Sequence, residues 1–204
     1  MARCVALSRI AVTKGEYPFG TVIARDGKIV TEAINRTIRE RDVSRHAEII
    51  ALTQAQKTIG REQLRRCTLY SNIEPCAMCS YCIREAWVGR VVYALGSPVM
   101  GGLSKWNILR DGDMSGRIPQ IFAAAPEIVS GLGVREAQQA WRDWNPLAWH
   151  MIKLRGLLTE PCAHDVQVRP AHERSLWHHL QSLFERTSRA RIETNAPDVR
   201  EQEL

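Results

Sequence analysis

The chain has 204 residues, of which 45% are hydrophobic and 25% charged, and its net charge is +6. These are the values of an ordinary globular protein, and a chain of this length can bury a sizeable core. No apolar run approaches the roughly 20 residues that a membrane helix needs, and the apolar stretch at the N-terminus is shorter than a signal peptide requires. We therefore expect a cytoplasmic protein with no membrane contact.

Hydrophobic periodicity predicts strands that alternate with helices over the first 155 residues. The dipeptide Asp26-Gly27 predicts a tight hairpin turn, Ser44 is the expected N-cap of a helix, and Pro146 should break or kink another. In chain order, the expected elements are a helix over 2–14, strands over 19–24 and 28–34, a polar, arginine-rich loop over 35–45, a helix over 46–59, a strand over 67–73, a helix over 75–86, strands over 90–95 and 127–130, and a helical stretch over 134–155. This alternation favours an α/β fold, a three-layer α/β/α sandwich with a mixed sheet.

The last quarter of the chain differs in composition from the rest. Residues 156–204 carry one amphipathic piece, formed by Leu176, Leu180, Leu183 and Phe184, between polar segments, and histidines that lack metal-ligand spacing. We therefore expect a domain over 1–155 and a C-terminal extension over 156–204.

Two short motifs carry the chemistry: His46-Ala47-Glu48 and Pro75-Cys76-Ala77-Met78-Cys79. A catalytic zinc takes three nitrogen or sulfur ligands and leaves the fourth position to water, and His46, Cys76 and Cys79 give that count. The two cysteines lie in the first turn of a predicted helix, whose positive end favours thiolates. We therefore predict Zn²⁺ as the cofactor.

Glu48 follows the histidine by two residues, a spacing at which it reaches metal-bound water more easily than the metal itself. It is the expected proton carrier, from water to a ring nitrogen and then to the leaving amine. The predicted chemistry is attack of zinc-hydroxide on an amidine-like ring carbon with loss of ammonia. H-x-E followed by P-C-x-x-C is the signature of zinc deaminases.

With these motifs the chain resembles the cytidine-deaminase-like superfamily, in its tRNA adenosine deaminase and guanine deaminase branch. The resemblance covers most of the chain, from about residue 6 to residue 144. It is carried by Pro18-Phe19-Gly20-Thr21-Val22-Ile23, Asp26-Gly27, Asn35, His46-Ala47-Glu48-Ile49, Thr68-Leu69-Tyr70, Glu74-Pro75-Cys76-Ala77-Met78-Cys79 and Arg90-Val91-Val92-Tyr93-Ala94. The resemblance implies a five-stranded sheet with helices on both faces and a homodimer whose partner helps to shape the pocket.

The resemblance also implies the substrate contacts. Asn35 and the backbone N–H of Ala47 would face the base, and Glu74 and Pro75 would line the site. Independently of the resemblance, Trp106 is a candidate for stacking on a base. A core or dimer-packing role is the alternative for Trp106, and a turn-forming role is the alternative for Asn35.

The branch signals disagree. Pro18-Phe19-Gly20 is more typical of enzymes that act on free bases, whereas the segment 101–109 resembles the tRNA enzymes. Ser104 and Lys105 stand where guanine deaminases carry acidic residues. A free nucleobase or nucleoside is our first expectation for the substrate, and adenosine in tRNA is the alternative.

Other interpretations stay open at this stage. The metal site could be structural, with Cys82 as a fourth ligand, although we favour Cys82 as a buried apolar residue. The arginines at 36, 39, 41 and 45 could form a phosphate-contacting rim or a solvated loop. A non-catalytic zinc scaffold for RNA binding or dimerisation is the third hypothesis, and the presence of Glu48 argues against it.

Overall fold

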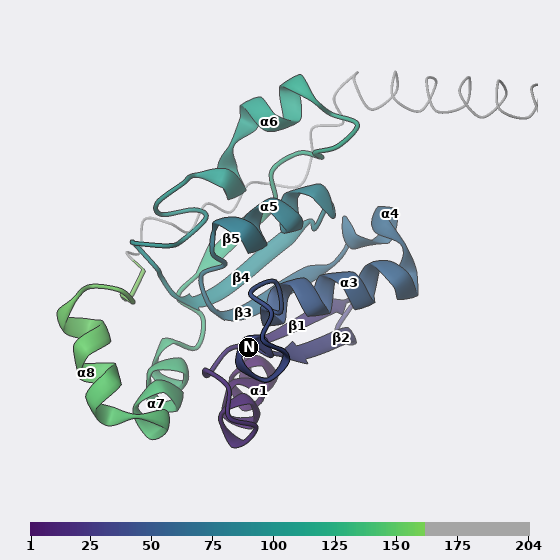
Figure 1. Cartoon of the computed structure of the whole chain (residues 1–204). Helices are drawn as coiled ribbons and strands as arrows, with labels where there is room; N and C mark the ends of the chain where they lie inside the picture. Colours follow the sequence, from purple (N-terminus) through teal and green to yellow (C-terminus); the bar gives the residue numbers. More distant parts are fainter. Residues whose placement is uncertain (162–204) are drawn as a thin grey trace, which may run out of the picture. The chain divides into compact units, whose positions relative to one another are not determined.

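The computed structural model describes residues 1–161, so the predicted amphipathic piece at 176–184 and its neighbouring histidines lie outside the described residues. Five strands form one sheet in the order β2-β1-β3-β4-β5 (Figure 1). Their bounds are Gly20–Arg25 for β1, Lys28–Ile34 for β2, Thr68–Ile73 for β3, Arg90–Leu95 for β4 and Glu127–Ser130 for β5. Strand β1 pairs antiparallel with β2 and β3, while β4 pairs parallel with β3 and β5. The predicted mixed sheet is confirmed.

The helices fall between and after these strands. They are α1 at Ala2–Thr13, α2 at Thr37–Glu40, α3 at Ala47–Ile59, α4 at Arg61–Leu64, α5 at Ala77–Glu85, the 3-10 helix η1 at Ile108–Arg110, α6 at Gly112–Arg117, α7 at Val134–Trp144 and α8 at Pro146–Leu154. The break expected at Pro146 is present, because Asn145 adopts an extended conformation there and its side chain caps α8.

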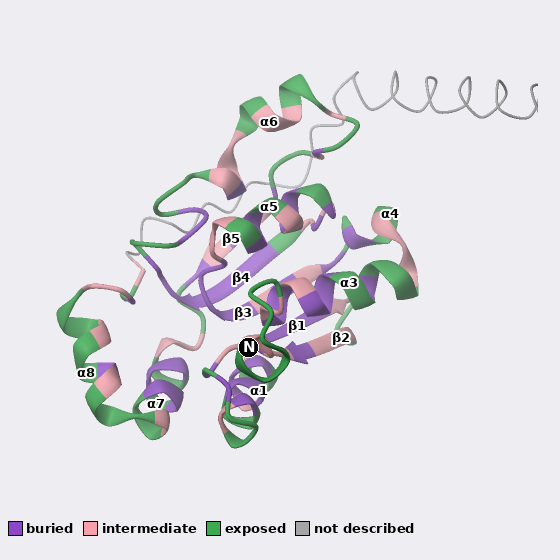
Figure 2. Cartoon of the chain, in the orientation of Figure 1, coloured by how far each residue is buried: buried purple, intermediate pink, exposed green. Residues whose placement is uncertain are grey.

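Helices cover both faces of the sheet (Figures 1 and 2). Successive strand side chains point to opposite faces, and the neighbours Val22 and Ile23 accordingly belong to different hydrophobic clusters. Ile23 packs in the cluster that contains residues of α3 and α5, and Val22 packs with residues of α1. Helix α7 joins the end of β4 in a further cluster through Trp141. The three-layer arrangement agrees with the prediction.

The hairpin between β1 and β2 turns at the predicted dipeptide. Asp26 and Gly27 have φ values of 50° and 76°, which is the left-handed geometry that a two-residue hairpin turn requires. Asp26 tolerates this region better than most residues, and glycine adopts it without strain. The turn sets the register in which Arg25 faces Lys28, and a β-bulge between Ile23 and Ala24 shifts the pairing by one residue, so that Gly20 faces Ile34.

Two details of the helix starts differ from expectation. Ser44 is not the N-cap of α3, because its hydroxyl and backbone N–H both bind Asp42 Oδ1, and the helix begins after His46. Helix α5 begins at Ala77 and not at Pro75, with Cys76 in the N-cap position. In both helices a metal-ligand candidate thus occupies the N-cap position, with no side-chain cap hydrogen bond.

Arg84 of α5 organises the long connection between β4 and β5. Its side chain is buried, and its guanidinium donates to the carbonyl oxygens of Ile108, Leu109 and Asp111 and to the Ser115 hydroxyl. Burial lowers the pKa of Arg84. A single charged side chain therefore holds η1 and the start of α6 against the helix that carries the cysteines.

Candidate metal centre

The three predicted metal ligands come together where α3 and α5 begin. His46 Nδ1 lies 3.6 Å from Cys76 Sγ and 3.4 Å from Cys79 Sγ. One ligand atom from each of the three residues lies within 4.8 Å of the others. The fold brings them together because Cys76 follows the end of β3 by three residues, while α3 packs beside α5.

These separations suit zinc. Zinc–sulfur and zinc–nitrogen bonds of about 2.3 and 2.0 Å in a tetrahedron place sulfur and nitrogen roughly 3.5 Å apart. The observed distances of 3.4 and 3.6 Å match this value. Among the described residues, Cys82 does not join the group that could hold a metal. The donor set is therefore one imidazole and two thiols, the composition of a catalytic site with an open fourth position.

The protonation of the two thiols is coupled. The hydrogen bond between the two thiols lowers the pKa of Cys76 to about 4. The same interaction and burial raise the pKa of Cys79 well above its usual value. The bond with Cys76 also raises the pKa of His46. A metal that takes both sulfurs must therefore displace the proton of Cys79.

Glu48 lies beside the ligands and is only 5% exposed. Ser71 of β3 donates a 2.9 Å hydrogen bond to its Oε1, and Cys79 Sγ lies 3.7 Å from its Oε2. Burial raises the pKa of Glu48. The carboxyl group is thus held by one strand and one helix, beside the candidate metal ligands.

Asn35 follows β2 directly and is buried, with 3% of its surface exposed. Its Nδ2 donates to Glu16 Oε2 at 3.0 Å and to Thr37 Oγ1 at 2.8 Å. Ala47 is buried at the first position of α3, where the backbone N–H has no acceptor within the helix. Glu16 had no part in the predicted site, because its partner Asn35 lies 19 residues further along the chain.

Glu74 and Pro75, predicted to line the site, hold a loop in place. The Glu74 carboxylate accepts hydrogen bonds from the backbone N–H groups of Ser97, Leu103 and Ser104 and from the Ser104 hydroxyl. The carbonyl oxygen of Pro75 accepts from the N–H of Gly102. About four acceptor positions are available on a carboxylate, so Glu74 is committed to this loop, and a contact between its side chain and substrate stays a prediction.

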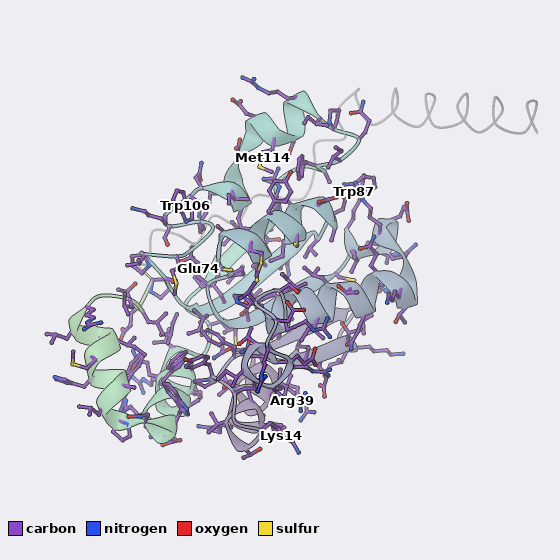
Figure 3. The ribbon with its side chains drawn as sticks, viewed as in Figure 1. Lys14, Arg39, Glu74, Trp87, Trp106 and Met114 are labelled. Carbon is purple, nitrogen blue, oxygen red and sulfur yellow. The ribbon has the colours of Figure 1, made fainter. Side chains whose placement is uncertain are left out.

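Trp106, labelled in Figure 3, follows the same loop. Its exposed fraction is 58%. Lys105 Nζ lies 6.0 Å from its ring centroid. A core role for Trp106 does not apply within residues 1–161, because so much of the ring faces solvent. Stacking on a base and packing against a second chain both fit its exposure.

The arginine-rich segment 35–45 contains the short helix α2, which was expected to be loop. Arg36 and Arg45 both form ion pairs with Glu40. Within residues 1–161, no such ion pair involves Arg39 or Arg41. The segment therefore presents two paired and two unpaired arginines.

Comparison with known proteins points to deaminases, as the donor set of the site does. The family model described as the cytidine and deoxycytidylate deaminase zinc-binding region matches residues 1–95. The tRNA-specific adenosine deaminase of Aquifex aeolicus is 33% identical over 109 residues, which are 53% of this chain and 72% of that protein. The guanine deaminase of Bacillus subtilis is 40% identical over 95 residues, or 46% of this chain and 61% of that protein.

A solved structure from work on A-to-I editing by tRNA:A34 deaminases superposes with a TM-score of 0.59 at 30% identity, covering 67% of this chain and 94% of the other.

In the part of the chain that the structure describes, no helix has the length and apolar character that crossing a membrane demands.

Proposed function

This chain belongs to the cytidine and deoxycytidylate deaminase family, and from that premise we propose that it removes an exocyclic amine from a free nucleobase or nucleoside, with zinc as its cofactor and ammonia as a product. The observation that carries the proposal is the buried Glu48 carboxyl beside His46, Cys76 and Cys79. A structural zinc site has four protein ligands and no need of a carboxyl group at this position.

The chain's own residues account for the proton transfers. When bound, zinc supplies a lower pKa for water at the site. Glu48 Oε2 would accept the proton of that water, pass it to the ring nitrogen beside the amine, and return a proton to the departing nitrogen. Overall, water replaces the amine as a carbonyl oxygen, and ammonia leaves. The N–H of Ala47 and the side chain of Asn35 would orient the ring.

Replacing Glu48 with Gln tests this role. We expect Glu48→Gln to keep its zinc and to lose ammonia release by a factor of about 10² to 10⁴, the usual contribution of a positioned acid–base group. The measurement is ammonia release by the zinc-loaded chain from guanine, adenine, cytosine, their nucleosides and a tRNA anticodon stem-loop.

Glu32→Gln is the matched control, because Glu32 pairs with Arg3 away from the metal ligands. The control should retain full activity. Undiminished turnover by Glu48→Gln would refute the proposed mechanism.

A second candidate is a tRNA adenosine deaminase. Two observations favour it. Arg39 and Arg41 form no ion pair within residues 1–161. Ser104 stands where guanine deaminases carry an acid, and its hydroxyl binds Glu74. Exposed arginines near the site would neutralise backbone phosphates.

The double substitution Arg39→Ala with Arg41→Ala separates the two candidates. If the substrate is tRNA, binding of the anticodon stem-loop should weaken. The slope of log Kd against the logarithm of the salt concentration should also fall by about one for each phosphate contact that is lost. The control replaces Arg66 and Arg117, two exposed arginines on other segments, with the same change of charge. Equal stem-loop binding by the double variant and the wild type would remove this candidate.

The predicted homodimer has support from exposed apolar side chains near the cysteines. Met78 and Tyr81 are exposed on one side of α5, and Val99 and Met100 are exposed in the loop that binds back to it. Exposed apolar groups that gather in this way are typical of interaction surfaces.

A further inference from the structure

Glu16 is a buried carboxylate that the proposed chemistry does not use. It lies in the turn after α1 and is 2% exposed. Its Oε1 accepts from the backbone N–H of Arg39 at 2.8 Å, and its Oε2 accepts from the N–H of Ile38 at 3.2 Å and from Asn35 Nδ2 at 3.0 Å. All three donors belong to the segment that follows β2, so one side chain fixes both the start of α2 and the predicted substrate contact.

This arrangement determines which end of the Asn35 amide is free. The Glu16 oxygens act as acceptors for backbone N–H groups, so the amide atom that faces Glu16 has to be the nitrogen. The second amide hydrogen goes to Thr37 Oγ1. Both hydrogens are thereby used, and within residues 1–161 no donor is recorded for Asn35 Oδ1.

We propose that Glu16 is a positioning residue that holds Asn35 with its carbonyl oxygen toward the substrate. The site then selects a base that presents an N–H or O–H donor at this position, because a substrate acceptor would meet another acceptor. The inference rests on the proposed function, in which Asn35 contacts the base.

The change of Glu16 to Gln is a sharp test because it keeps the size of the side chain. A glutamine has one acceptor oxygen, whereas donors approach both oxygens of Glu16. One end of the glutamine therefore becomes an NH₂ group that faces an N–H donor, and either Asn35 turns over or a backbone bond is lost. Glu32→Gln makes the same chemical change on a partly exposed side chain of β2 and is the control.

The first readout is the Asn35 side-chain amide in ¹⁵N-labelled full-length protein, identified by its absence from the spectrum of Asn35→Ala. In the wild type we expect slow hydrogen exchange at both amide protons. In Glu16→Gln the exchange should be at least about tenfold faster, since a hydrogen bond is lost. Wild-type exchange as fast as that of exposed amides would overturn the inference without any reference to activity.

The second readout is a double-mutant cycle on ammonia release. We expect Glu16→Gln to lower kcat/KM about tenfold, mainly through KM, with unchanged zinc content, and to have less than about a twofold effect when Asn35 is already alanine. An equal loss in both backgrounds would show that Glu16 acts through the fold and would overturn the inference.

The cycle also separates this inference from the proposed function. Full activity in Asn35→Ala would overturn the inference, because nothing would then act through Asn35. Slow exchange at the Asn35 amide in a protein that releases no ammonia from any substrate of the panel would instead overturn the proposed function. The claim that Asn35 selects the base would then fall as well.

Discussion

Cys79 and Cys82 lie one turn apart on α5, yet only Cys79 comes within reach of His46. The side chain of Cys82 packs against the hydrophobic cluster under α3 and α5 instead. The difference follows from helix geometry, since residues three apart share a face but sit at different heights along it. The two thiols therefore have separate roles that substitution can distinguish.

We expect Cys79→Ser to lose bound zinc and Cys82→Ser to keep it. The wild type should carry about one zinc per chain, as a three-ligand catalytic site requires. Metal content after dialysis against a weak chelator is the measurement. Loss of zinc from Cys82→Ser to the same degree would identify Cys82 as a fourth ligand and a structural site.

At the level of single residues, spacing was enough to predict which three candidate metal ligands come together. The candidate ligands lie at the starts of two helices that the sequence predicts: His46 before α3, and Cys76 and Cys79 in the first turn of α5. The order of the strands brings those two helix starts together. The positions of Glu16 and Glu74 could not be foreseen in this way. Their carboxylates bind backbone N–H groups of segments distant in sequence, and no local pattern encodes such pairs.

At the level of elements, the sheet and the long helices matched their predicted ranges to within about two residues, the usual uncertainty of helix ends. The four-residue helices α2 and α4 were missed, because a single turn leaves no periodic signal. Helix α6 was missed for a related reason, since it buries none of its residues. It depends on the contacts that Arg84 makes and not on an apolar face of its own.

Arg84 should therefore be important for stability. We expect Arg84→Met to lower the free energy of unfolding by about 3 kcal/mol, because several buried carbonyl oxygens lose their donor. Urea unfolding is the measurement. Arg90→Ala provides the contrast. Arg90 pairs with Glu127, and half of the Arg90 side chain is exposed, so this change should lower the free energy of unfolding by less than about 1 kcal/mol. Equal losses would mean that Arg84 does not anchor the connection.

The loop that Glu74 holds depends on a glycine. A Cβ atom on Gly101 would overlap the Glu74 carboxylate. We expect Gly101→Ala to lower the free energy of unfolding by about 2 kcal/mol, the range of overpacked sites. Gly116→Ala in α6 is the control, since nothing lies within 4 Å of its added atom. A neutral Gly101→Ala, judged by thermal unfolding, would contradict the described packing.

At the level of the whole molecule, the contacts of the domain continue past the predicted boundary at residue 155. Leu158 is buried, and Gly96 and Thr159 exchange backbone hydrogen bonds of 2.8 and 3.0 Å. Gln138 of α7 donates to Glu160. The chain after α8 thus returns to the end of β4, close to the loop that Glu74 binds.

Two truncations test how much this return contributes. We expect a chain ending at residue 155 to be about 2 kcal/mol less stable than one ending at residue 161, from the loss of one buried leucine and two backbone hydrogen bonds. Urea unfolding of both, alongside the full chain, is the measurement. Equal stability of the two truncated chains would place the boundary at 155 as predicted.

The hairpin turn at Asp26-Gly27 has a consequence for the order in which the protein folds. It makes β1–β2 a local pairing, whereas β1 and β3 meet only when Thr21 comes to face Ser71. Closing that longer loop costs more chain entropy, so we expect the hairpin to form first. The loop carries α3, and Ser71 is the partner of Glu48. A newly made chain should therefore become able to capture its metal only as fast as the centre of its sheet closes.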